Sequence, residues 1–262
     1  MIEIRNLYKS FGGKQILNGM NLTVRRGETK VIIGRSGVGK SVLLKNIVGL
    51  IRPDAGSIKV NGVEVTNLEE REYNKIRMEI GFVFQGGALF DSMSVGENVA
   101  FVLNEFMDLD KKTVDDRVSD ALALVGLKDV QELMPSQLSG GMRKRVSLAR
   151  VLCMEPQIIL YDEPTSEVDP ITAAAINNLI IEMRDKLKVT SIVVTHDMNM
   201  AYKVADSIAM FYHGQVIADG SVDEIRHSKH PVVYQFIHGE AHGPITEDES
   251  LVFGHIIQKP NS

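Results

Sequence analysis

The sequence predicts an α/β fold, with a sheet core of mixed strand direction, covering helices and an inserted helical lobe. Three observations predict it. Short apolar runs rich in branched residues, typical of buried parallel strands, occur at 31–33, 157–162 and 190–195. A glycine-rich turn and a helical pattern follow the first run, as in one half of a layered α/β unit. The middle third of the chain has helical spacing of its apolar residues.

The first part of the chain is expected to form strands separated by glycine turns. Residues 1–7 alternate apolar and polar side chains, as a half-buried strand does. A Gly12-Gly13 turn follows, and the next strands are expected at 21–24 and 29–33. The last of these ends at a glycine, and residues 41–50 then have helical spacing.

The remaining elements continue the same layered pattern. Further strands are expected within 54–62, between two turns, and at 80–85. Apolar residues recur at helical spacing over 95–127 and 141–154, where they lie above charged neighbours. A helix at 172–186 connects the two later apolar runs, which makes a strand–helix–strand crossover.

The chain is expected to divide into one main domain and a short extension. A length of 262 residues fits one domain with an appended lobe. We assign residues 1–238 to the main domain and about 92–152 within it to the helical lobe. Residues 239–262 are polar, contain glycine and histidine, lack periodicity and are expected to form an extended tail.

Composition excludes several classes of protein. An apolar content of 44% is ordinary for a chain with a real core, which excludes wholesale disorder. The net charge of −5 lacks the basic footprint of a duplex-DNA binder, so no nucleic-acid partner is expected. No apolar run approaches the ~20 residues of a membrane span, and no signal peptide is recognisable. Cys153 is the single cysteine, which agrees with a reducing compartment, so we expect a soluble cytoplasmic protein.

A phosphate-binding loop follows the strand at 29–33. The motif is Gly34-Arg35-Ser36-Gly37-Val38-Gly39-Lys40-Ser41. Its glycines let successive backbone N–H groups converge on phosphate oxygens, and the following helix adds the positive end of its dipole. In such loops the lysine reaches the β- and γ-phosphates and the serine hydroxyl binds Mg²⁺. A glycine turn that merely begins a helix is the alternative, but the strand–loop–helix context favours binding of a nucleoside triphosphate.

Two acidic residues end the strand at 157–162. An apolar strand brings Asp162 to the edge of the sheet where open α/β folds bind ligands. Asp162 is suited to hold Mg²⁺, and Glu163 is placed to accept a proton from an attacking water. Alone, these residues would be interpreted as an acidic strand end before Pro164. Together with the phosphate loop they predict nucleotide hydrolysis.

A third motif indicates the family. Residues Leu138-Ser139-Gly140-Gly141-Met142 resemble the signature of ATP-binding cassette (ABC) ATPases, usually Leu-Ser-Gly-Gly-Gln. The resemblance extends over the first ~240 residues, a full length for one nucleotide-binding domain. It implies the P-loop NTPase fold of the ABC type, ATP and Mg²⁺ as ligands, and ATP hydrolysis coupled to transport.

The resemblance assigns roles to single positions. Phe11 is similar to the aromatic residue that stacks on adenine, and Gln85 to the glutamine that touches Mg²⁺ and faces the transmembrane partner. His196 matches the switch histidine at the γ-phosphate. The resemblance also implies that Ser139 and Gly141, beside Gly140, contact ATP held by a second copy. The implied active form is therefore a head-to-tail homodimer with two ATP molecules between the subunits.

Two departures from the family pattern point to a subfamily. Met142 replaces the usual glutamine, and Glu167-Val168 replaces the commoner Ala-Leu of the D-loop. Neither removes a phosphate-, metal- or proton-handling group. With the run 89–95 and the tail from His238, these motifs look like the ATPase of Mce-type lipid transporters, most closely the Mla cassette. In that subfamily the extension reaches the neighbouring subunit.

The resemblance also implies partners and a location. The partners are a transmembrane permease, a Mce-domain substrate-binding protein and, as an open question, a small regulatory subunit. The location is peripheral, on the cytoplasmic face of the inner membrane. Phospholipid transport for outer-membrane lipid asymmetry is the leading function. An importer of small solutes and a non-transport assembly ATPase remain alternatives, because both share the phosphate-handling residues.

Smaller features have ordinary interpretations. The histidines at 227, 230, 238 and 242 lack neighbours at metal-ligand spacing and are expected to be solvated. Cys153 is expected to be a small core residue. The basic run Arg143-Lys144-Arg145 is expected on a solvated helix face, with a secondary role in attracting polyphosphate. The apolar loop Gly86–Phe90 is either tucked against the domain or part of a groove for the permease, and we favour the groove.

Overall fold

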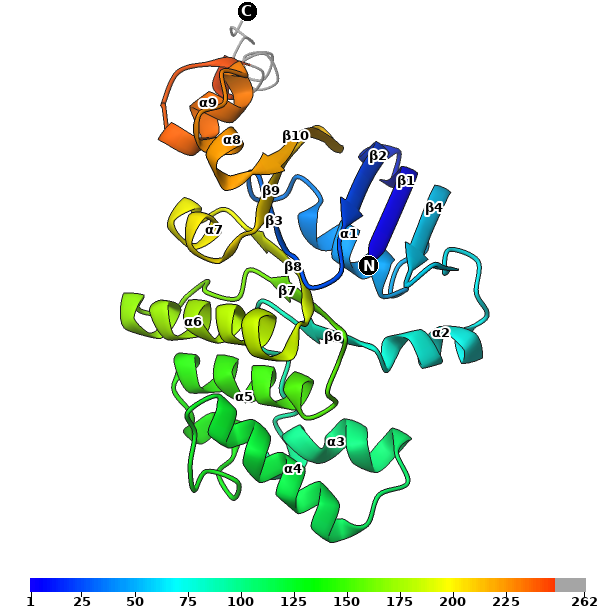
Figure 1. Cartoon of the computed structure of the whole chain (residues 1–262), viewed down its shortest axis with the longest axis vertical. Helices are drawn as coiled ribbons and strands as arrows, with labels where there is room; N and C mark the ends of the chain where they lie inside the picture. Colours follow the sequence, from blue (N-terminus) through cyan, green and yellow to red (C-terminus); the bar gives the residue numbers. More distant parts are fainter. Residues whose placement is uncertain (248–262) are drawn as a thin grey trace, which may run out of the picture.

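The computed structural model describes residues 1–247, which form two sheets and a helical lobe (Figure 1). The central sheet has the strand order β10-β9-β3-β8-β7-β6. Its strands are β3 (Thr29–Ile33), β6 (Ile80–Val83), β7 (Ile158–Asp162), β8 (Thr190–Thr195), β9 (Ser207–Tyr212) and β10 (Gln215–Ser221). Only β10 is antiparallel to its neighbour, so this sheet has the expected mixed direction.

The second sheet is antiparallel, with the order β2-β1-β4-β5. It contains β1 (Ile2–Phe11), β2 (Lys14–Val24), β4 (Ala55–Val60) and β5 (Val63–Glu64). The second strand begins seven residues before the expected 21–24. Irregular pairing explains the difference, because the register between β1 and β2 shifts three times and Gly19 has a φ of 67°. These irregularities disrupt the simple alternation on which strand prediction depends.

The first helix joins the two sheets. Helix α1 (Lys40–Ile47) follows β3, and its Leu43, Leu44 and Ile47 are fully buried. They belong to one apolar cluster with Ile32 of the central sheet and the inner residues of the antiparallel sheet. Helix α2 (Glu70–Arg77) connects the antiparallel sheet to β6. Helix α1 is therefore held by apolar packing against both sheets.

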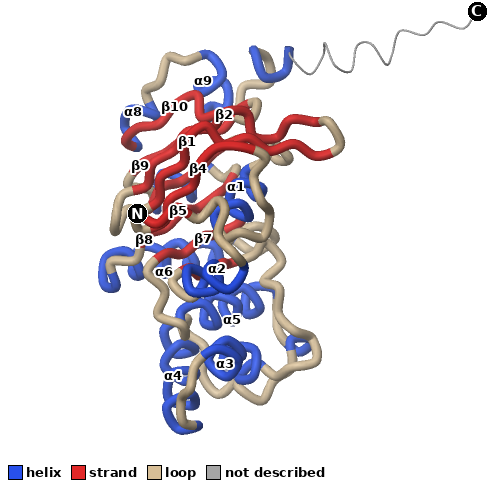
Figure 2. The backbone as a smooth tube through the Cα atoms, turned by 90° about the vertical axis from the view of Figure 1, so that its right-hand side faces the viewer, coloured by secondary structure: helices blue, strands red, loops and turns tan. Residues whose placement is uncertain are grey.

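Three helices form the lobe, α3 (Val95–Phe106), α4 (Lys111–Leu124) and α5 (Gly140–Leu152). The expected helical stretch 95–127 is divided between the first two, because Asp110 caps a new helix by accepting from the backbone N–H of Thr113. Ser94 begins α3 with a capping box to Glu97. Figure 2 shows this lobe at the opposite end of the molecule from α8 (Val222–Arg226) and α9 (Pro231–His238).

The two remaining helices flank the central sheet. Helix α6 (Pro170–Leu187) follows β7, and α7 (Met198–Val204) follows β8. A second apolar cluster joins α6, α7 and the helical lobe to the central sheet. Across residues 1–247, every helix is too short or too polar to cross a bilayer.

The expectation of an extended tail from Gly239 is wrong for residues 239–247. The chain folds back onto α9 after Gly239, and residues 244–247 are helical. The side chain of Gln235 is buried and holds this segment, because its Oε1 accepts from the N–H of Ile245 at 2.8 Å. Its Nε2 donates to the hydroxyl of Thr246 at 3.3 Å. The rest of the expected tail, 248–262, lies outside the described residues.

Candidate nucleotide site

The phosphate loop lies between β3 and α1 and depends on glycine at two close approaches. A Cβ atom at Gly34 would lie 2.5 Å from the carbonyl oxygen of Phe211. At Gly39, where φ is 107°, it would lie 2.6 Å from a methyl group of Ile16. Any side chain there would have to displace the loop from β9 or β2.

The N-terminus of α1 keeps its N–H groups open. Its N-cap is Gly39, so no side chain accepts a hydrogen bond there. Helices α3 and α6 carry the side-chain caps Ser94 and Asp169, whereas α2 and α9, which have the same length as α1, also lack such a cap. The first N–H groups of a helix and its dipole together favour an anion. This end of α1 can therefore receive a phosphate group.

Lys40 lies inside the loop, with only 5% of its surface exposed. Its Nζ donates to the carbonyl oxygens of Gly34 at 2.7 Å and Arg35 at 2.9 Å. It also lies 3.7 Å from Oε1 of Glu163. Burial lowers the pKa of Lys40, and the neighbouring carboxylates of Glu163 and Asp162 oppose that change. The ammonium is thus held where the loop can present it to a phosphate.

Ser41 and Asp162 form the second part of the site. The hydroxyl of Ser41 donates to Oδ1 of Asp162 at 2.7 Å, and Asp162 ends β7 with 5% exposure. Burial raises the pKa of Asp162, while this hydrogen bond lowers it. One hydroxyl and one carboxylate in contact are oxygen ligands of the kind Mg²⁺ prefers. These two residues fit the expected metal.

Glu163 connects the loop to the end of β8. Its backbone has a φ of 47°, and its N–H donates to the carbonyl of Val194 at 3.0 Å. Its Oε1 lies 3.0 Å from Nδ1 of His196, the residue that follows β8. The carboxylate is 12% exposed and the imidazole 57%. The structure therefore brings Lys40, Glu163 and His196 together around one carboxylate oxygen.

Two other predicted residues lie further from this cluster. Phe11 ends β1 with 46% exposure, and the ammonium of Lys9 lies 5.2 Å from its ring centre. Its ring is open to solvent, as a stacking platform requires. Gln85 is exposed two residues after β6, next to β7 in the sheet. Its backbone carbonyl accepts a hydrogen bond from Lys144.

The signature residues lie on the helical lobe at the start of α5. Ser139 is its N-cap and accepts from the backbone N–H of Met142 at 3.2 Å. Gly141 packs closely on α6, because a Cβ there would lie 2.7 Å from the methyl group of Thr172. Ser139 is exposed, and Gly140 and Gly141 are partly exposed. The motif therefore presents an accessible helix N-terminus on a different lobe from the phosphate loop.

The expectation that Arg143-Lys144-Arg145 lies on a solvated face is wrong for its central residue. Lys144 is 8% exposed. It points between the lobe and the sheet, where its Nζ donates to the Ser166 hydroxyl at 3.1 Å. Sequence reasoning missed it because its neighbours in the motif are also cationic. The available signal was the phase of the helix, which places Lys144 one turn before the buried Leu148 on the same face.

The loop after Gln85 is held by two buried polar side chains. Asn98 of α3 accepts from the N–H of Phe90 at 2.8 Å and donates to its carbonyl at 3.0 Å. Arg150 of α5 donates to the carbonyls of Ala88 and Gly87. Phe90 itself stays 42% exposed. The loop is thus anchored to the lobe and still presents an aromatic ring, and its expected role as a permease groove stays a prediction.

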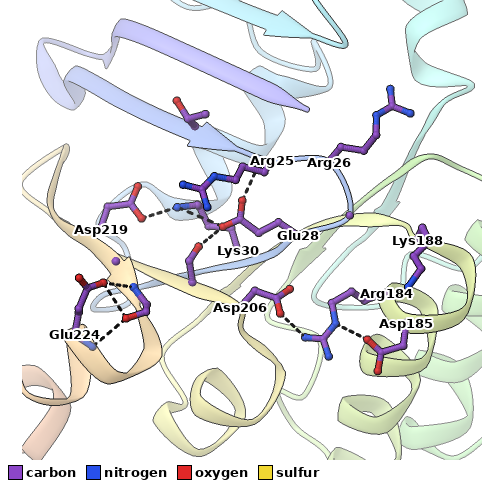
Figure 3. A pocket seen from close by; sticks show the side chains of 15 residues that line it. Arg25, Arg26, Glu28, Lys30, Arg184, Asp185, Lys188, Asp206, Asp219 and Glu224 are labelled. Carbon is purple, nitrogen blue, oxygen red and sulfur yellow. Dashed lines mark hydrogen bonds and ion pairs between the residues drawn. The ribbon is translucent and has the colours of Figure 1, made fainter.

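A separate charged pocket lies at the other end of the sheet (Figure 3). It has a volume of about 760 Å³ and includes Lys30 at the start of β3, whereas the phosphate loop follows the strand's end. Its charges largely neutralise one another. Lys30 forms an ion pair with Asp219, and Arg184 contacts Asp206 at 3.0 Å. This pocket is distinct from the nucleotide site.

Cys153 is a core residue, as expected. It is 3% exposed at the end of α5, and burial raises the pKa of its thiol to about 11. A thiol with such a pKa is almost entirely protonated at neutral pH and therefore a poor nucleophile.

Comparison with known proteins decides the family. Residues 17–166 match the ABC transporter family. The chain belongs to that family. It is 38% identical to the intermembrane phospholipid transport system ATP-binding protein MlaF of Haemophilus influenzae, over 94% of this chain and 93% of that protein. It is 41% identical to the probable ribonucleotide transport ATP-binding protein mkl of Mycobacterium tuberculosis, over 95% of this chain and 69% of that one.

A solved structure supports the same assignment. A dimeric ATP-binding cassette in a post-hydrolysis state, bound to ADP and phosphate, superposes with a TM-score of 0.79. It is 31% identical and covers 85% of this chain and 99% of its own. The chain is thus an ABC ATPase with the expected P-loop fold, and it hydrolyses ATP to power a transporter.

Proposed function

We propose that this ABC ATPase drives phospholipid transport of the Mla and Mce type. The observation that carries the proposal is its match to MlaF along almost the whole of both chains. The departures in the signature and D-loop, Met142 and Glu167-Val168, support the same subfamily. The partners would be a transmembrane permease and a Mce-domain protein, with the chain on the cytoplasmic face of the inner membrane.

ATP would bind through its phosphates at the loop. The N–H groups at the start of α1 receive phosphate oxygens, and Lys40 exchanges its carbonyl acceptors for them. Ser41 and Asp162 would hold Mg²⁺, which when bound neutralises charge on the β- and γ-phosphates. Phe11 offers an exposed ring for the adenine.

Hydrolysis then needs one proton acceptor. Glu163 accepts a proton from water as the water oxygen bonds to the γ-phosphorus and the bond to the ADP oxygen breaks. His196, 3.0 Å from that carboxylate, orients it and steadies the γ-phosphate. The loop lysine lies 3.7 Å from the same carboxylate oxygen, so the proton acceptor stands next to the group that would bind the γ-phosphate.

A second copy would complete each site. Ser139 and Gly141 are accessible at a helix N-terminus on the lobe, and such a terminus binds an anion well. In a head-to-tail dimer they would contact the γ-phosphate held by Lys40 of the other subunit. Dimer closure would then move the lobe, and the loop after Gln85 would transmit that movement to the permease.

Transport of a small solute is the second candidate. The observation that favours it is the 41% identity to mkl, whose name refers to ribonucleotide transport. The phosphate-handling residues do not distinguish the two cargoes, because they touch ATP and not the cargo. The discriminating feature is the partner protein outside the membrane.

Purification from native membranes tests the proposal. The tagged chain is extracted in a mild detergent, and co-eluting proteins and lipids are identified by mass spectrometry. We expect a permease, a Mce-domain protein and bound phospholipid. The Lys40→Met variant is a control for nucleotide dependence of the assembly. Recovery of a solute-binding protein with its permease would overturn the lipid assignment and leave the ATPase intact.

A further inference from the structure

We propose that Lys144 is a positioning residue, which couples the signature helix to the backbone of the hydrolytic base and to the loop at Gln85. The inference rests on the proposed role of Glu163 as that base. In this role Lys144 transmits movement of the helical lobe to the ATP site of the same subunit. No part of the proposal requires Lys144 to touch ATP.

Three segments of the chain supply hydrogen-bond acceptors to the ammonium group of Lys144. Lys144 lies in α5, five residues after Ser139. Its Nζ donates to the backbone carbonyl of Gln85, to the hydroxyl of Ser166 at 3.1 Å and to the carbonyl of Glu163 at 3.4 Å. Each acceptor belongs to a different part of the site: the loop after β6, the loop after the base, and the base itself. An ammonium has three N–H donors, so the set is filled.

Ser166 reinforces the contact to the base. Its hydroxyl donates to the same carbonyl of Glu163, at 2.9 Å. The backbone N–H of Ser166 donates to it as well, at 3.1 Å, so that carbonyl accepts from three groups, and the residue that carries it has a φ of 47°. A non-glycine residue keeps such a backbone only when its surroundings hold it there. Lys144 and Ser166 thus fix the peptide from which the carboxylate projects.

Burying the ammonium of Lys144 costs desolvation energy, which offsets the stability gained from its hydrogen bonds. Burial lowers its pKa, and the carboxylates of Glu167, Glu163 and Asp162 oppose this. A methionine has nearly the same length and would fill the space with no ammonium to desolvate. A buried cation with three separate acceptors is instead suited to holding them in one arrangement.

The consequence is a link between two ATP sites. The N-terminus of α5 carries the signature, which in the proposed dimer contacts ATP on the other subunit. A rotation of α5 moves Lys144 with it, and the acceptors at Gln85 and Glu163 belong to this subunit's own site. Signature engagement at one site would thereby set the position of the base at the other.

The test compares Lys144→Met with Lys144→Arg in the full-length chain. Lys144→Met removes the donors, whereas Lys144→Arg keeps a charge and several donors. Lys112→Met, on the exposed part of α4 in the same lobe, is the matched control for charge. We measure phosphate release at saturating Mg-ATP, the Kd of a fluorescent ATP analogue, and the thermal midpoint of each variant. Rates are divided by the number of nucleotide-binding sites, so unfolded protein does not count.

We expect Lys144→Met to lower kcat per site by about 10- to 100-fold, as loss of a supporting hydrogen-bond partner commonly does. The Kd should change less than threefold, Lys144→Arg should recover part of the rate, and Lys112→Met should match the parent. A merely structural lysine would lower the thermal midpoint and the active fraction but leave kcat per site unchanged, which would overturn the inference. Glu163→Gln is measured in parallel. A parental rate in that variant would refute the base itself, independently of Lys144.

Discussion

The Glu163→Gln variant tests the assigned chemistry most directly. Glutamine keeps the size of the side chain and removes its charge and its capacity to accept a proton. Its carboxamide oxygen can still face Nδ1 of His196, which lies 3.0 Å from the native carboxylate. Lys40, at 3.7 Å, loses an anionic neighbour that competes with phosphate. We therefore expect ATP to bind at least as tightly as in the parent.

The expected loss of rate follows from the surroundings of the carboxylate. Removal of a general base commonly costs a factor of ~10²–10⁴. His196 is adjacent and 57% exposed, so it can accept part of the proton transfer. We expect Glu163→Gln to hydrolyse ATP about 10²–10³-fold more slowly than the parent, which is the lower half of that range. This loss corresponds to about 3–4 kcal/mol in the activation barrier. Glu163→Gln combined with His196→Ala should lose more.

The assay measures phosphate release at saturating Mg-ATP, together with nucleotide binding and size-exclusion elution. ATP should hold the variant as a dimer, because binding is intact and hydrolysis is slow. Glu182→Gln, an exposed carboxylate on α6, is the control and should match the parent. Turnover by Glu163→Gln within threefold of the parent would refute the assignment of the base.

Three further predictions concern the frame of the site. Asp162→Asn should unfold at higher temperature than the parent at pH 7 and lose ATPase activity. Burial raises the pKa of Asp162, so the charged carboxylate destabilises the parent above that pKa. The difference in unfolding temperature between Asp162→Asn and the parent should therefore shrink as the pH falls through the raised pKa. Calorimetry from pH 7 to pH 4 measures this. Gly39→Ala should lose nucleotide binding and at least ~1–2 kcal/mol of stability, because its φ is 107° and its Cβ would meet Ile16. In denaturant unfolding, Gly12→Ala is the control for the clash, since its φ of 55° is also strained for alanine but its Cβ would meet nothing within 4 Å. Asn98→Ala should cost about 1–3 kcal/mol in the same assay, because it leaves the N–H of Phe90 without its partner, while the carbonyl of Phe90 keeps the N–H of Met93. Its ATPase activity per folded molecule should remain, while stimulation by the permease in vesicles should fall.

Sequence patterns predicted the parts of the site that are local in the chain. The phosphate loop and the end of β7 are contiguous motifs, and parallel strands bring their carboxyl ends to one edge. The contact between Ser41 and Asp162 follows from that rule, since β8 alone separates their strands. The fold class was also predictable from local patterns, because the apolar residues of buried strands and of lobe helices recur with different periods.

Other features depend on packing between distant segments. Lys144 looks like its cationic neighbours in the chain, and only the fit of α5 against the sheet buries it. The fold of residues 239–247 depends on one buried amide, Gln235, which no periodic pattern marks. The early start of β2 depends on a bulge at Gly19, where a Cβ would lie 2.8 Å from the hydroxyl of Tyr8. Each of these is set by a contact that is invisible in a short window of sequence.

The contacts of Lys40 indicate why ATP binding should precede hydrolysis. Its ammonium is shared among two carbonyl oxygens and the carboxylate of Glu163. A phosphate group carries more charge than either carbonyl, so it competes well for the same donors. Once Lys40 turns toward phosphate, Glu163 keeps His196 as its neighbour and gains freedom to face water. With Glu163 in its proposed role, the substrate would thus release the base that acts on it, from the ion pair that Glu163 forms with Lys40.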